Sequence, residues 1–464
     1  MFKEDTIAAI TTGMSNAGVG IIRISGDRAC EITDMLFRAA NKNKKAVNMK
    51  SYTAAFGGVY EDDRMIDEAI LLVMKAPHTY TCEDVCELQC HGGIVVLRKI
   101  LDLVIKCGAR AAEPGEFTKR AFLGGRIDLS QAESVMDIIN AKNDFAARTS
   151  VEQLQGRLRD KIIDMREQIL YNVAFIESAL DDPEHYSLDG FPEKLLEEDK
   201  KWITIAKEML DSYDNGRIIA EGIRTCIVGK PNAGKSSFLN ALLGEERAIV
   251  TDIAGTTRDT LEESVTIDGI TLNIVDTAGI RDTEDKVESI GVERAKKEIE
   301  SADLILFLMD TSVQISEEDI EILQRIRDKK KIILLNKSDK ATEESGFEQS
   351  ALKEYISEET PVISISAKYG DGIDNFIMEL KNMMFHGRID VNQEVYITNA
   401  RHKDALAKTY ESLECVERSI EAGMPEDFFT IDLMNAYEKL GLIIGESVEE
   451  DLVNEIFSKF CTGK

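Results

Sequence analysis

A glycine-rich loop at residues 229–236 combines the residue types and spacing needed to hold a polyphosphate. Its sequence, Gly229-Lys230-Pro231-Asn232-Ala233-Gly234-Lys235-Ser236, fits the pattern Gly-x-x-x-x-Gly-Lys-Ser/Thr. An apolar run precedes it at 226–228 and a helical pattern follows at 238–243. The glycines let backbone N–H groups face a polyphosphate, and the helix start adds partial positive charge. We therefore expect Lys235 to reach the β- and γ-phosphates and the Ser236 hydroxyl to bind Mg²⁺.

Further polar stretches follow this loop in the order that a nucleotide site requires. Asp276-Thr277-Ala278-Gly279 ends a strand pattern, so its carboxylate can hold Mg²⁺ through water and its last N–H can meet a γ-phosphate. Asn336-Lys337-Ser338-Asp339 also follows a strand pattern, and Ser366-Ala367-Lys368 can close over the same base. The span 251–259 has the pattern of a switch loop whose threonines bring a hydroxyl to Mg²⁺.

Asp339 determines which base the site prefers. Its carboxylate can accept two N–H bonds, from guanine N1 and N2. Adenine lacks this donor pair and would leave a charged acceptor unmatched, at a cost of about 1.5–3 kcal/mol or more. The predicted GTP contacts are Asn232, Ala233, Gly234, Lys235, Ser236, Ser237, Thr251, Asp252, Ile253, Ala254, Gly255, Thr256, Thr257, Asp276, Thr277, Ala278, Gly279, Asn336, Lys337, Asp339, Ser366, Ala367 and Lys368.

The residue after Gly279 is unusual for a nucleotide hydrolase. Ras-like enzymes place a glutamine there to orient the attacking water, whereas this chain has Ile280. Hydrolysis therefore needs another group to position water and another positive charge. A carboxylate of the cluster Glu284, Asp285 and Glu288 can orient water, and Arg258 is either an arginine finger or a solvated side chain.

Composition indicates a multidomain protein of the cytoplasm. The 464 residues are enough for two to four domains, and no window holds the roughly 18 apolar residues of a membrane span. The eight cysteines do not suggest a secreted disulfide framework, so a soluble, cytoplasmic protein without membrane contact is expected. With 56 basic and 85 acidic residues, the net charge of −29 repels nucleic acid. Handling RNA would therefore need a local basic patch or a basic partner.

The hydrophobic patterns predict four segments. Residues 1–118 mix strand and helix patterns and suggest an α+β domain, and residues 119–217 are helical. Residues 218–382 alternate short apolar runs with amphipathic segments, which indicates a mostly parallel sheet with helices on both faces. Residues 383–464 are helical again. The two helical blocks are expected to form one domain into which the α/β domain is inserted, because each alone leaves an apolar stripe exposed.

Apolar residues between Val151 and Leu180 recur every three or four positions. This spacing, with an eleven-residue repeat, predicts one long and nearly straight helix. Asp181-Asp182-Pro183 is expected to end it.

Three segments together resemble the MnmE (TrmE) family of tRNA uridine-modification GTPases. They are Gly-Lys-Pro-Asn-Ala-Gly-Lys-Ser-Ser-Phe-Leu-Asn from Gly229, Ala-Ile-Val-Thr-Asp-Ile-Ala-Gly-Thr-Thr-Arg-Asp from Ala248, and the C-terminal Phe-Cys-Thr-Gly-Lys. The resemblance covers the whole chain, including 80–85 and 113–118. The chain departs from the family pattern in the loop 11–17 and at Thr462.

The resemblance implies a cation in place of an arginine finger. In the family, K⁺ is bound through positions that match Asn232, Thr251, Ile253 and Thr256, and Mg²⁺ through Ser236 and Thr257. The water-orienting carboxylate of the family matches Glu288, which acts when two G domains meet, and this agrees with the missing glutamine.

The resemblance also implies a reduced folate, 5,10-methylene- or 5-formyl-tetrahydrofolate, in the N-terminal domain. The matching positions are Arg23, Glu87, Arg126 and Lys464. A carboxylate suits a pterin ring and cations suit a folate tail. Cys461 lies in the C-terminal tetrapeptide that faces this site, either as a chemical group or as a structural thiol.

The implied assembly is a homodimer through the N-terminal domain that forms a heterotetramer with an MnmG-like flavoprotein. Together they would add a carboxymethylaminomethyl or aminomethyl group to C5 of the wobble uridine of certain tRNAs. Because the chain is acidic, tRNA is expected to bind largely through the partner. A ribosome-assembly GTPase of the Era type and a purely regulatory GTPase remain alternatives, although residues 383–464 lack the Gly-x-x-Gly loop of a KH domain.

Overall fold

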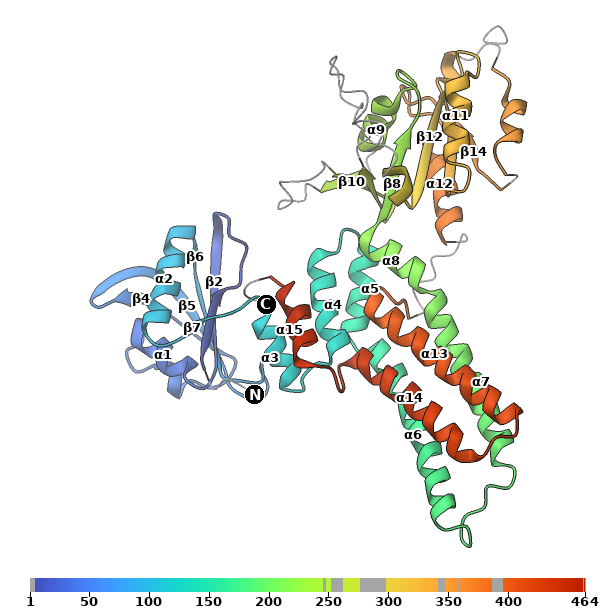
Figure 1. Ribbon diagram of the computed structural model, residues 1–464. Coiled ribbons are helices and arrows are strands. Elements are labelled where there is room, and N and C mark those ends of the chain that lie inside the picture. The colour runs from blue at the N-terminus through green and yellow to red at the C-terminus, as the bar shows by residue number, and fades with distance from the viewer. Residues whose placement is uncertain are drawn as a thin grey trace. The chain divides into compact units, whose positions relative to one another are not determined.

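The computed structural model describes residues 5–244, 248–251, 262–275, 298–340, 347–357, 359–385, 395–461 and 463 (Figure 1). The chain forms two compact units. One comprises residues 1–136, 152–202 and 408–464, and the other comprises residues 137–151 and 203–407. Each unit therefore combines segments that are distant in the sequence.

The N-terminal part of the first unit is a seven-stranded sheet in the order β3-β4-β5-β6-β2-β1-β7. Neighbouring strands are antiparallel, except that β7 runs parallel to β1. The strands are β1 (Ile7–Ile10), β2 (Ala17–Ser25), β3 (Phe37–Ala39), β4 (Thr53–Glu61), β5 (Arg64–Met74), β6 (Val85–Gly92) and β7 (Arg110–Ala111).

The two faces of this sheet differ in character. Helices α1 (Ala29–Leu36) and α2 (Ile94–Lys106) cover one face, where Ile22, Leu88 and Leu71 are buried in a common core. The opposite face, which we call the outer sheet face, carries the row Arg23, Glu87, Leu72 and Ala54 across four strands. A neighbouring row on the same face consists of Ile21, Gln89, Ile70 and Phe56.

The first unit also contains helices that precede and follow residues 203–407 of the second unit in the sequence. Helix α6 (Arg157–Asp181) packs against α14 (Glu426–Ile444), and α3 (Glu116–Leu123) packs against α15 (Glu450–Ser458). Arg166 of α6 donates from Nη2 to Glu446 Oε2 at 2.5 Å, which links segments 280 residues apart. The remaining helices of this region are α4 (Leu129–Asn140), α7 (Phe191–Asp211) and α13 (Ala400–Glu421).

The prediction of one helix from 151 to 180 is wrong at its beginning. Helix α5 (Asp144–Leu154) ends before Gly156, which has φ of +94°, and α6 starts at Arg157. Leu158, Ile162, Met165 and Ile169 are buried as the spacing predicts, because α6 keeps the periodicity after the break. A left-handed glycine at the junction allows the chain to end one helix and begin another without losing the apolar stripe.

The second unit contains a seven-stranded sheet in the order β14-β13-β12-β8-β11-β10-β9. Its five strands from β14 to β11 are parallel, and β10 and β9 are antiparallel additions. The strands are β8 (Ile223–Val228), β9 (Ala248–Thr251), β10 (Glu262–Ile267), β11 (Ile270–Val275), β12 (Leu304–Asp310), β13 (Lys331–Asn336) and β14 (Val362–Ser364).

Helices cover both faces of this parallel sheet. Helices α9 (Lys235–Gly244) and α12 (Ile373–Phe385) share a core in which the rings of Phe238 and Phe376 lie 5.5 Å apart. Helix α11 (Glu317–Arg325) inserts Leu323 into the core on the other face. The other elements of this unit are α8 (Tyr213–Glu221), η2 (Ser338–Lys340) and η4 (Gln349–Glu354), and the short helix η1 (Ala46–Asn48) belongs to the first unit.

The predicted fold class is confirmed: an N-terminal α/β sheet domain, helical segments, and a P-loop domain with a mostly parallel sheet. The boundaries 118, 217 and 382 stay a prediction. Within the part of the chain that the structure describes, every helix is too short or too polar to cross a bilayer.

Candidate functional site

The glycine-rich loop joins strand β8 to helix α9, the position that a phosphate-binding loop requires. Its backbone takes left-handed φ angles at Asn232 (+64°) and Gly234 (+96°). A Cβ atom at Gly234 would collide with the Nδ2 atom of Asn336. Glycine is therefore required at position 234 by both the backbone conformation and the close approach of the neighbouring loop.

Lys235 lies across this loop. Its Nζ atom donates to the carbonyl oxygens of Gly229 at 2.7 Å and Lys230 at 2.9 Å, and burial lowers its pKa. Both acceptors are neutral, so a bound anion would supply a charge partner that these carbonyls do not. The loop, the cation and the start of α9 with Ser236 and Ser237 therefore fit a polyphosphate.

Asn336 joins the three loops that the sequence places far apart. Its Nδ2 atom donates to the Ala233 carbonyl at 2.8 Å, and its Oδ1 atom accepts from the Ala367 N–H at 3.0 Å. Asn336 ends strand β13 and is buried. A single side chain thus sets the phosphate loop and the 366–368 loop at fixed positions relative to each other.

Asp339 occupies an exposed position in η2 beside this junction. Its Oδ1 atom accepts a hydrogen bond from the Ser366 hydroxyl at 2.8 Å. Lys337, with φ of +64°, donates from Nζ to Asp310 Oδ2 at 2.6 Å, which anchors the segment to the end of β12. Burial alone would raise the pKa of Asp310, but the hydrogen bonds from Lys337 and Ser312 outweigh it and lower that pKa. The Asp339 carboxylate is therefore held in place yet remains open to a base.

Several predicted residues fall outside this geometry. For Thr251 only its place at the end of β9 is described. The predicted residues that lie outside the described ranges are Asp252, Ile253, Ala254, Gly255, Thr256, Thr257, Arg258, Asp276, Thr277, Ala278, Gly279, Glu284, Asp285, Glu288 and Lys464. Asn232 and Ser236 are the members of the predicted K⁺ and Mg²⁺ sets whose side chains are described.

The described members of the predicted folate set, Arg23, Glu87 and Arg126, lie near one another beside the outer sheet face. Arg23 Nε donates to Glu87 Oε1 at 2.8 Å across β2 and β6, and both side chains are less than one-fifth exposed. The Arg23 guanidinium lies 5.1 Å from the ring centre of Tyr80, and that of Arg126 lies 4.6 Å from the same ring. Tyr80 therefore contacts both arginines.

Arg23 retains capacity for a ligand. Its buried Nη1 atom has no hydrogen-bond partner among the described residues. A buried, unsatisfied guanidinium N–H is costly, and a ligand acceptor would remove that cost. A pterin ring fits this pair, because its N–H groups can donate to Glu87 and its acceptor atoms can bind Arg23 Nη1.

The C-terminal tail reaches the same part of the first unit. The Gly115 N–H donates to the Cys461 carbonyl at 3.3 Å, and Gly463 packs against the Ile10 carbonyl. Gly115 immediately precedes α3, whose Phe117 ring lies 5.5 Å from the Arg23 guanidinium. The Cys461 side chain is exposed.

The sequence assigned no role to Tyr80, Phe117 or Asp310. Tyr80 lies in a loop and Phe117 in a helix, so no periodic pattern relates either of them to a strand arginine. Asp310 ends strand β12, and a polar residue at the carboxyl end of a parallel strand was the available signal for it.

Comparison with known proteins gives full-length matches. A family model described as the MnmE helical domain matches residues 129–461, and one described as the GTP-binding protein TrmE N-terminus matches residues 6–126. The chain is 53% identical over 462 residues to the tRNA modification GTPase MnmE of Lachnoclostridium phytofermentans, covering 100% of both chains. It is 47% identical over 468 residues to that of Clostridioides difficile, again covering 100% of both. An Era variant from Aquifex aeolicus bound to GDP·AlF4⁻ is 28% identical, with a TM-score of 0.27, over 41% of this chain and 66% of that one.

Proposed function

The chain belongs to the MnmE family of tRNA modification GTPases and hydrolyses GTP, and from this membership we propose that it is a K⁺-dependent enzyme of wobble-uridine modification. In this proposal it works with an MnmG-like flavoprotein to add a carboxymethylaminomethyl or aminomethyl group at uridine C5. The observation that carries the proposal is the Arg23–Glu87 pair with its unsatisfied guanidinium N–H. A GTPase that only times a protein contact has no use for such a site.

The proposed K⁺ and Mg²⁺ sites share the phosphate loop. Asn232, which stands in a left-handed conformation in mid-loop, would bind K⁺ together with Thr251, Ile253 and Thr256. Ser236, in the first turn of α9, would bind Mg²⁺ together with Thr257. When bound, K⁺ supplies the positive charge that an arginine finger supplies elsewhere, and Glu288 would orient the attacking water.

The proposed folate site would hold 5,10-methylene- or 5-formyl-tetrahydrofolate. Glu87 would accept N–H bonds from the pterin ring, and Arg23, Arg126 and Lys464 would bind acceptor oxygens. Tyr80 and Phe117 offer aromatic surfaces beside the two described arginines. Cys461 would be a candidate chemical group at this site, because its carbonyl accepts a hydrogen bond from Gly115, directly before α3.

The proposed assembly is a cytoplasmic homodimer through the N-terminal domain, joined to the flavoprotein in a heterotetramer. The net charge of the chain supports the proposal that the flavoprotein, and not this chain, provides most of the tRNA-binding surface. At a net charge of −29, the chain as a whole repels the tRNA backbone. The flavoprotein would therefore supply much of the surface that binds tRNA.

Replacing Glu87 with glutamine is expected to slow tRNA modification by about tenfold or more at limiting folate and leave GTP hydrolysis unchanged. Glutamine keeps the side-chain size but removes the charge that holds Arg23 and accepts pterin N–H bonds. We expect reduced-folate affinity to fall by about tenfold or more, the loss of a charge-assisted hydrogen bond worth about 1.5–3 kcal/mol.

The measurement is a reconstituted reaction of full-length chain, flavoprotein, GTP, folate and unmodified tRNA, followed by nucleoside mass analysis. Glu31→Gln, an exposed acidic residue of α1 in the same domain, is the matched control. A wild-type mixture that leaves the uridine mass unchanged, or a Glu87→Gln variant that binds folate as the wild type does, would refute this assignment.

A further inference from the structure

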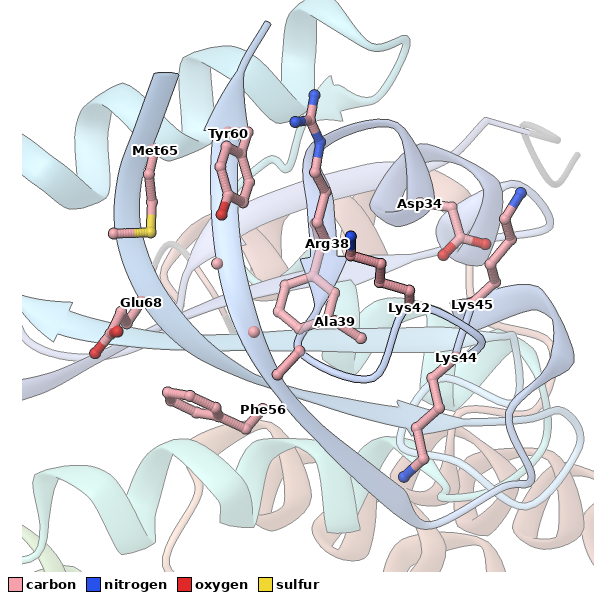
Figure 2. Close-up of a pocket in the computed structure, with 14 residues that line it drawn as sticks. Asp34, Arg38, Ala39, Lys42, Lys44, Lys45, Phe56, Tyr60, Met65 and Glu68 are labelled. Carbon is pink, nitrogen blue, oxygen red and sulfur yellow. The ribbon is translucent and has the colours of Figure 1, made fainter. Parts of the chain in front are cut away.

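A second concave site lies on the N-terminal sheet, away from the Arg23–Glu87 pair. The pocket has a volume of about 600 Å³ and is formed by β3, the following loop, β4 and β5. Figure 2 shows the side chains of Arg38, Lys42, Phe56, Tyr60 and Met65 around it. A volume of this size accommodates one nucleotide-sized group.

The pocket is rich in positive charge. Arg38, Lys42, Lys44 and Lys45 line it, against the two carboxylates of Asp34 and Glu68. Asp34 is already bound by the backbone N–H groups of Ala46 at 2.6 Å and Val47 at 3.2 Å. The loop that carries the three lysines is thereby anchored to α1, so the cations are held at the pocket rim.

The lysines are available to a ligand. Lys42, Lys44 and Lys45 are exposed, and none of them forms an ion pair within the described residues. Arg38 binds the Asp62 carbonyl at 2.5 Å and the Asp63 carboxylate at 3.3 Å, but the Asp63 side chain is 99% exposed. Such an exposed pair contributes little and can be exchanged for a phosphate.

Aromatic surface accompanies the charge. The Arg38 guanidinium lies 4.5 Å from the ring centre of Tyr60, which fixes it over the pocket. Phe56, at 57% exposure, presents an open ring on the adjacent part of β4. Lysines beside an exposed aromatic ring are the combination by which proteins hold single-stranded nucleic acid, with phosphates on the cations and a base on the ring.

The pocket is connected with the candidate folate site through the outer sheet face. Phe56 is paired through Ile70 and Gln89 to Ile21, in the row next to that of Arg23 and Glu87. Three strand spacings of about 4.8 Å separate β4 from β2, so the two sites are about 15 Å apart. An extended single-stranded nucleic acid that reaches one site can therefore contact the other.

The local charge allows a polyanion to approach. Residues 1–118 contain 14 Lys and Arg against 16 Asp and Glu, a net charge of −2, whereas the whole chain carries −29. The N-terminal segment is thus nearly neutral, and the long-range repulsion arises from the rest of the chain.

We propose that this pocket binds a single-stranded segment of the tRNA substrate, with phosphates on Lys42, Lys44 and Lys45 and a base against Phe56. The inference rests on the proposed function, because that function provides the RNA. An oligoglutamate folate tail is another polyanion, but it has no base to use the exposed ring, so the aromatic residue favours RNA.

The test uses the full-length chain carrying Lys42→Gln, Lys44→Gln and Lys45→Gln together. A fluorescent, unmodified tRNA transcript is titrated at several salt concentrations, with and without the flavoprotein. Losing three phosphate contacts on single-stranded RNA should make the fall of log affinity with log salt less steep, by about 2 in the slope. It should also weaken binding by about tenfold at low salt. The control carries Lys161→Gln, Lys201→Gln and Lys207→Gln, three exposed helical lysines with the same change of charge.

Photo-cross-linking locates the RNA independently. We expect cross-linked peptides from the wild-type chain to contain Phe56 or Tyr60. Unchanged affinity and slope in the pocket variant, cross-links only outside the pocket, or loss of pentaglutamyl-folate binding without loss of tRNA binding would each overturn the inference. Wild-type protein that neither binds nor modifies tRNA would instead refute the proposed function. GTP hydrolysis equal to that of the wild type shows that the variants are folded.

Discussion

Replacing Asp339 with asparagine is expected to weaken GTP binding by about 10²- to 10⁴-fold. Two charge-assisted hydrogen bonds to guanine N1–H and N2–H are lost or weakened, each worth about 1.5–3 kcal/mol. The asparagine amide can donate to a C2 carbonyl, so affinity for xanthosine triphosphate should rise at the same time. ATP should remain a poor ligand, since adenine has neither arrangement.

The measurement is competition of GTP, ATP and xanthosine triphosphate against a fluorescent guanine nucleotide. Asp374→Asn, at an exposed position in α12, serves as the control and should leave the order of affinities unchanged. Because Asp339 also accepts a hydrogen bond from Ser366, a purely structural role would lower affinity for all three nucleotides equally. That outcome would remove Asp339 from base recognition.

Replacing Asp199 with asparagine is expected to stabilise the helical region at neutral pH. Asp199 in α7 is fully buried, and neither carboxylate oxygen has a hydrogen-bond partner among the described residues. Burial raises its pKa to about 8, the nearby Glu417 carboxylate adds to the shift, and Lys200 opposes it. In the unfolded chain the same group ionises near pH 4.

The pH dependence follows from this raised pKa. Between about pH 4 and pH 8 the unfolded chain releases a proton that the folded chain retains, so the free energy of unfolding falls as the pH rises. The slope is about 1.4 kcal/mol per pH unit, or about 2.7 kcal/mol between pH 5 and pH 7. Asparagine cannot ionise, so this decline should disappear in the variant.

Trp202 provides a local readout of this effect. It is the single tryptophan of the chain, is 1% exposed, and lies one turn from Asp199 in α7. Urea unfolding followed by its fluorescence at pH 5, 6, 7 and 8 should show a midpoint that falls with pH in the wild type and in the control Glu197→Gln, but not in Asp199→Asn. Parallel curves in all three proteins would mean that Asp199 is ionised when folded.

Local sequence patterns determine much of the nucleotide site. The phosphate loop, strand β13 and the start of α9 depend on short apolar runs and glycines, and each forms where the spacing predicts. The Asn336 clamp could not be predicted, because its hydrogen bonds to Ala233 and Ala367 span 103 and 31 residues. Gly156 shows a different limit: the apolar period continues through a helix break, so periodicity alone does not reveal it.

The sites on the N-terminal sheet depend on pairing between distant strands. Arg23 and Glu87 are 64 residues apart and meet only because β2 pairs with β6 in a particular register. The family resemblance indicated both residues, but it gave no role to Tyr80, whose ring contacts Arg23 and Arg126. No sequence motif marks the lysines near residue 42, because Arg38, Tyr60 and Phe56 lie beside them only after β3 and β4 pair.

The rate of GTP hydrolysis in KCl against NaCl, at equal ionic strength and saturating Mg²⁺, tests the central claim most directly. A cage of amide and carbonyl oxygens fitted to K⁺ should hold Na⁺ less well. The bound K⁺ takes the place of an arginine finger, whose positive charge raises the rate of hydrolysis by about 10³–10⁵ in arginine-finger GTPases. We therefore predict turnover at least about tenfold faster in KCl, and a loss of this difference in Asn232→Ala. Equal turnover of the wild-type chain in the two salts would contradict the account.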